Sequence, residues 1–76
     1  MPTPNLPPDP DKENDNRAEW ARAALHEFRR ITGTDEDDAL CDLLCDLMHW
    51  CDRNGADFHK ELRRAKWHYA EETKNG

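Results

Sequence analysis

The sequence predicts an all-α fold, a small three-helix bundle preceded by a disordered, proline-rich N-terminal arm. Apolar side chains recur every three or four residues in three successive stretches, and no stretch alternates with a period of two. Two short breaks separate the stretches, and each contains a glycine, Gly33 or Gly55. A glycine after such a run is a usual helix stop, because it adopts the left-handed conformation without steric cost.

The chain length allows one small domain. Its 76 residues bury only a thin core unless the chain is cross-linked or oligomeric. Residues 1–15 contain five prolines, four acids and one large aliphatic side chain, Leu6, so they are interpreted as the disordered arm. The three-helix domain is expected over residues 16–72, and residues 73–76 are expected to fray.

The first helix is expected to begin at Asn16, which lies three residues before Glu19, the spacing of a capping box. Its apolar stripe is Trp20, Ala24, Phe28 and Ile31. The very short turn at Gly33 predicts that this helix and the next lie antiparallel.

The central helix, residues 34–54, opens with Thr34 as a capping residue and four acids, which suit the positive end of the helix dipole. Its apolar arc covers about half of the circumference, more than one flanking helix can cover. Leu40, Leu44, Leu47 and Cys51 are expected to pack on the other two helices. This assignment leaves Leu43 and Trp50 on a flank, where we expect a homodimer interface with Trp67 at its rim.

The third helix is expected to be capped by Asp57, with the stripe Phe58, Leu62, Ala65 and Tyr69. Trp67 points about 180° away from Phe58. It is therefore expected either to contact a neighbouring chain or another partner, or to lie flat on the side-chain stem of Arg63 or Arg64. The candidate basic and aromatic binding face is Lys60, Arg63, Arg64 and Trp67.

A second candidate face is an acidic row on the central helix, opposite its apolar arc: Asp35, Asp38, Asp42, Asp46 and His49. The simpler interpretation is a solvated face that matches the helix dipole. The alternative is a surface that binds a basic partner.

Residues 38–69, DALCDLLCDLMHWCDRNGADFHKELRRAKWHY, resemble the second half of MazG-type all-α nucleotide pyrophosphohydrolases. The resemblance places Asp38 and Asp42 at that family's metal-binding acids, and Gly55, Asp57 and Phe58 at the turn that follows. It implies a magnesium-dependent enzyme acting on nucleoside triphosphates. The family's first helix supplies two further carboxylates as Glu-x-x-Glu, and residues 16–32 contain no such pair.

Neither a cofactor nor a metal site nor a catalytic residue is expected. Cys41, Cys45 and His49 follow one another at four-residue steps, but a closed zinc site needs four ligands. The sequence has no apolar run long enough to cross a membrane, and its isolated cysteines favour a reducing cytoplasm.

The function expected from the sequence is therefore protein binding, as an adaptor or inhibitor, with a homodimer as the assembly. The chain is similar in type to small acidic proteins of phages and mobile elements, among them anti-CRISPR inhibitors. Two alternatives remain: the pyrophosphohydrolase, and a nucleic-acid binder that resembles a helix-turn-helix with a basic third helix. The formal charge of -6 disfavours the nucleic-acid binder.

Overall fold

The computed structural model describes residues 5–75, which form three helices. They are α1 (Asn14–Thr32), α2 (Glu36–Asn54) and α3 (Phe58–Glu72), and residues 5–75 contain no strand. The all-α, three-helix fold expected from the sequence is confirmed. What was expected of residues 1–4 and 76 lies outside the described residues.

The predicted helix stops and the third cap are confirmed. Gly33 has a φ of 73° and its N–H donates to the Arg29 carbonyl at 2.7 Å. Gly55 has a φ of 70° and its N–H donates to the Cys51 carbonyl. Both glycines adopt the left-handed conformation that a residue with a Cβ disfavours. The Asp57 carboxylate accepts from the Lys60 N–H at 3.1 Å, as a capping side chain does.

The other two predicted caps are wrong. Helix α1 begins at Asn14, two residues earlier than expected, and the Asn16 amide instead donates to Glu13 Oε2 at 2.9 Å. The Thr34 hydroxyl donates to Asp42 Oδ2 at 2.6 Å rather than capping the first turn of α2. Asn16 lies inside the first turn of α1, and Thr34 lies one residue before the N-cap Asp35 of α2, so neither residue occupies the position from which a side chain caps the helix.

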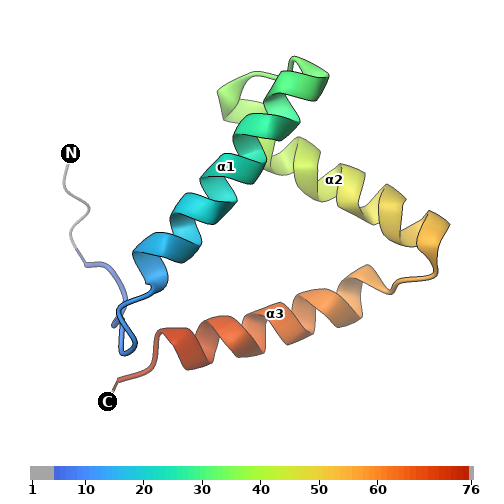
Figure 1. Ribbon diagram of the computed structural model, residues 1–76. Coiled ribbons are helices and arrows are strands. Elements are labelled where there is room, and N and C mark those ends of the chain that lie inside the picture. Colours follow the sequence, from blue (N-terminus) through green and yellow to red (C-terminus); the bar gives the residue numbers. More distant parts are fainter. Residues whose placement is uncertain (1–4, 76) are drawn as a thin grey trace.

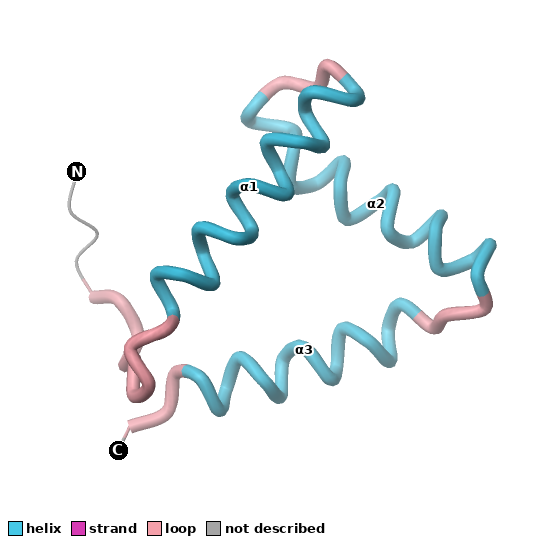
Figure 2. Tube along the Cα trace, viewed as in Figure 1, coloured by secondary structure: helices cyan, strands magenta, loops and turns pink. Residues whose placement is uncertain are grey.

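The three helices meet only near their ends and enclose an open triangle (Figures 1 and 2). The molecule is flat, with extents of 40 × 31 × 16 Å. Helices α1 and α2 touch beside the turn at Gly33 and then diverge, so the expected antiparallel packing of these two helices is wrong. Helix ends that touch at corners cannot cover whole apolar stripes, because most of each stripe lies between the corners.

Little of the chain is buried as a result. Within residues 5–75 only Ala39, 3% exposed, and Cys51, 8% exposed, are buried. Leu25, Phe28, Leu43 and Phe58 are half-buried. Cys51 was expected in the core, but its companions on the expected stripe of α2 are exposed, as are most large apolar residues: Leu6, Trp20, Ile31, Leu40, Leu44, Leu47, Met48, Trp50, Leu62, Trp67 and Tyr69.

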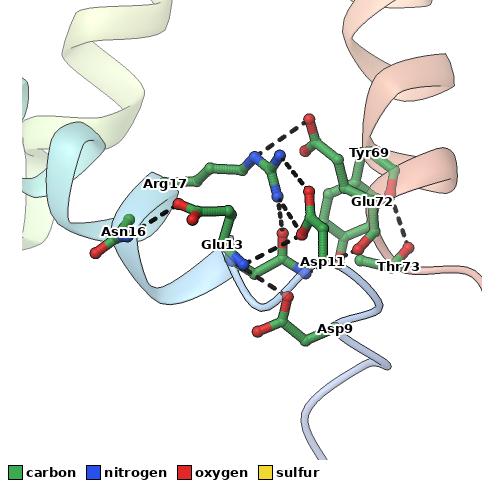
Figure 3. Close-up of polar contacts among 9 residues, drawn as sticks. Asp9, Asp11, Glu13, Asn16, Arg17, Tyr69, Glu72 and Thr73 are labelled. Carbon is green, nitrogen blue, oxygen red and sulfur yellow. Dashed lines mark hydrogen bonds and ion pairs between the residues drawn. The ribbon is translucent and has the colours of Figure 1, made fainter.

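The third corner joins the start of α1 to the end of α3 (Figure 3). The Asn14 amide donates to the Glu72 carbonyl at 2.8 Å. Arg17 donates to both Asp11 carboxylate oxygens, at 3.0 and 2.8 Å, and lies 3.4 Å from the Glu72 carboxylate. We call Asp11, Asn14, Arg17 and Glu72 the clasp. These bonds lower the pKa of Asp11 to about 2, chiefly through the hydrogen bond from Arg17.

Two members of the clasp, Asp11 and Asn14, lie within residues 1–15, over which a disordered arm was expected. Leu6 and Pro7 also line a pocket together with Tyr69 and Thr73 of the opposite chain end. The sequence pattern gave no sign of this contact, because Asn14 and Glu72 are 58 positions apart.

Candidate protein-binding surfaces

The acidic row is exposed along α2 with one exception. Asp35, Asp38, Asp46 and His49 are exposed, whereas Asp42 is half-buried and accepts the Thr34 hydroxyl. The structure therefore keeps the predicted residues on one helix, and it gives Asp42 a local structural contact that the sequence did not predict.

Within residues 5–75, no carboxylate of α2 forms an ion pair with a basic side chain. All ion pairs among residues 5–75 lie in α1, in α3 with its following residues, or in the clasp: Arg17 with Asp11 and Glu72, Arg22 with Glu19, Arg30 with Glu27, Arg64 with Glu61, and Lys74 with Glu71. Helix α2 carries six carboxylates and one guanidinium, a net charge of −5 out of −6 for the whole chain.

The carboxylates of α1, unlike those of α2, form ion pairs within their own helix. Hydrogen bonds from Arg22 and Arg30 lower the pKa values of Glu19 and Glu27 respectively. Each pair is three residues apart on the same helix, a spacing at which side chains meet. The net charge of the chain is therefore concentrated on α2, whereas both of these α1 carboxylates are paired with arginines of the same helix.

The predicted basic and aromatic face is exposed on α3. Lys60, Arg63, Arg64 and Trp67 are all exposed, and Trp67 keeps 63% of its surface in solvent. Arg64 pairs with Glu61 at 2.8 Å, which reduces its charge toward a partner. The Trp67 indole packs edge-on against its sequence neighbour His68, with ring centroids 5.2 Å apart.

The apolar surface of α2 is arranged differently from the expected dimer flank. Of the two residues expected on this flank, Leu43 is half-buried and Trp50 is 58% exposed. The continuous apolar groove is formed by Leu40, Cys41, Leu44, Cys45 and Met48, with Asp37 at its edge. Sequence reasoning assigned Leu40 and Leu44 to the core. Their spacing is the same for a core stripe and for an interface, so the pattern alone could not separate the two.

The residues that face the start of α2 from α1 are cationic. Arg22, His26 and Arg29 line a pocket with Glu36 and Ala39. Among residues 5–75 no three or more His, Cys, Asp or Glu side chains form a group that could hold a metal ion.

Comparisons of the chain with protein-family models, with curated proteins and with solved structures found no match. Over the described part of the chain, no helix has both the length and the apolar character required to cross a membrane.

Proposed function

We propose that this protein is an interaction module that acts by binding, and that the acidic row of α2 binds a basic surface of another protein. The observation that carries the proposal is the distribution of ion pairs: within residues 5–75, none involves a carboxylate of α2. An adaptor or an inhibitor of a basic protein works in this way, without catalysis.

The helix dipole accounts for only part of the acidic row. Its effect is confined to the first turn, which contains Glu36, Asp37 and Asp38. Asp42 and Asp46 lie further along the helix, and Asp38, Asp42 and Asp46 follow one another at four-residue steps. Like charges at that spacing destabilise an isolated helix by a few tenths of a kcal/mol per pair. A cationic partner removes this repulsion and is attracted over a distance by the field of the whole row.

The proposal is tested by replacing Asp38 and Asp46 together with asparagine. Asp42 is kept, because its bond to Thr34 makes it part of the fold. The matched control is Glu19→Gln with Glu61→Gln, which changes the net charge by the same amount on α1 and α3. The partner is first captured from the source cell and identified by mass spectrometry, and its affinity for each variant is then measured at low and high salt.

We expect the Asp38/Asp46 variant to bind about 2- to 30-fold more weakly at low salt, from about 0.2–1 kcal/mol for each exposed charge. Its salt dependence should be flatter than that of the control. Equal affinities of the two variants, or a captured partner whose contact surface is acidic, would contradict the proposal.

A further inference from the structure

The apolar side of α2 is nearly symmetric about Leu44. Leu40 and Met48 lie four residues before and after it, and Cys41 and Leu47 lie three residues before and after it. At about 100° per residue, these side chains fall within about 60° of Leu44 on the helix surface. Leu40, Leu44, Leu47 and Met48 are all exposed. We call Leu40, Cys41, Leu44, Leu47 and Met48 the α2 stripe.

The chain exposes more surface than a folded monomer of its size. Its accessible surface is 6627 Å² at 8.9 kDa, against about 4,800 Å² for a compact protein of this mass. The excess is thus about 1,800 Å². The radius of gyration, 14.6 Å, exceeds the value of about 11 Å expected for a compact chain of 76 residues.

We propose that a second copy of this chain covers the α2 stripe, with the two α2 helices antiparallel about a two-fold axis at Leu44. Leu44 then packs against its counterpart, Leu40 lies beside Leu47 of the other copy, and Cys41 lies beside Met48 of the other copy. The excess surface is spread over the whole chain, and this arrangement covers the part of it that lies on the α2 stripe.

The symmetry of the stripe argues for a second copy as its occupant. A two-fold interface requires one surface that is complementary to itself, and reversing α2 about Leu44 exchanges the members of the α2 stripe only with one another. Asp37, seven residues before Leu44 and at the edge of the groove, then lies opposite the Cys51 position of the other copy. The antiparallel arrangement also opposes the two helix dipoles. Asp42 and Asp46 lie about 160° from Leu44, so the acidic row points away from the seam and both rows remain open.

The inference goes beyond the proposed function, because it concerns the opposite side of α2. Its first test is the mass of the protein in solution by sedimentation equilibrium at micromolar concentration. We expect twice the chain mass of 8.9 kDa. Leu44→Glu should give the chain mass alone, while His49→Glu, which adds the same charge on the far side of α2, should remain a dimer. A monomeric parent chain, or a dimeric Leu44→Glu variant, overturns the proposal.

A second test does not depend on whether Leu44→Glu folds. Antiparallel helices packed at about 8–10 Å bring facing Cα atoms to about 3.4–5.4 Å, given a Cα radius of about 2.3 Å. That separation allows a disulfide. With Cys41 and Cys45 changed to alanine, Leu44→Cys should therefore form a covalent dimer under mild oxidation, and Asp46→Cys should not. Equal cross-linking of the two variants, or none in Leu44→Cys, places the interface elsewhere and overturns the seam. Neither test uses the captured partner, so the dimer proposal can fail while the proposed function holds.

Discussion

The clasp offers a sharp test of the open three-helix arrangement, through a single asparagine. Asn14 is half-buried and its amide donates to the Glu72 carbonyl at 2.8 Å, joining the first residue of α1 to the last residue of α3. Asn14→Ala removes this bond and also the local bond that Asn14 Oδ1 accepts from Arg17 at 2.7 Å. The control below also loses one local side-chain bond, so the tertiary bond is what distinguishes the two variants. Asn16→Ala is the matched control, since Asn16 lies in the same first turn and its amide bonds only to the nearby Glu13 in an exposed setting.

The expected difference between the two variants follows from one tertiary hydrogen bond. Such a bond contributes about 0.5–1.5 kcal/mol net. Replacing asparagine with alanine changes helix propensity in both variants, so that effect largely cancels in the comparison. For a domain of this size, 1 kcal/mol corresponds to about 4–8 °C in melting temperature. Asn14→Ala should therefore melt about 2–12 °C below Asn16→Ala.

The assay is thermal unfolding followed by far-UV circular dichroism, with all proteins at one concentration, since a dimer melts in a concentration-dependent way. Equal melting temperatures for the two variants would refute the reasoning. They would mean that the end of α3 gains nothing from its contact with α1.

Three further outcomes are expected. The pKa of Asp11 is lowered to about 2, so the ionised Asp11 side chain stabilises the fold fully at a pH above its ordinary pKa. This stabilisation is lost as the pH falls from about 4 toward 2. In Asp11→Asn, the free energy of unfolding should therefore depend less on pH in that range. Gly33→Ala should destabilise the protein by about 1–2 kcal/mol, because Gly33 has a φ of 73°, at which an alanine backbone is strained. Asparagine tolerates this conformation better, so Gly33→Asn should lose less stability in chemical denaturation. An equal loss in the two variants would contradict backbone strain as the cause. Millimolar Mg²⁺ should leave the melting temperature within a few degrees, and a larger rise that disappears in Asp38→Asn would favour the MazG-type alternative.

The sequence by itself determined where the helices end and which side of each one is apolar. Gly33, Gly55 and the Asp57 cap act within a few residues of their own positions, so local pattern is enough to place them. The acidic row is likewise a property of spacing on one helix. It could be found without knowing how the helices pack.

The tertiary structure decided which apolar side chains are covered. Ala39 rather than Leu40 is buried where α1 and α2 meet, because the angle between two helices selects the residues that touch, and a stripe in the sequence does not specify that angle. The contact at the start of α1 was likewise decided by the tertiary structure, because Asn14 donates to the carbonyl of Glu72, which is 58 positions away in the sequence. Exposure of Leu44 follows from the helices meeting only near their ends, a property of the packing that helical periodicity does not contain.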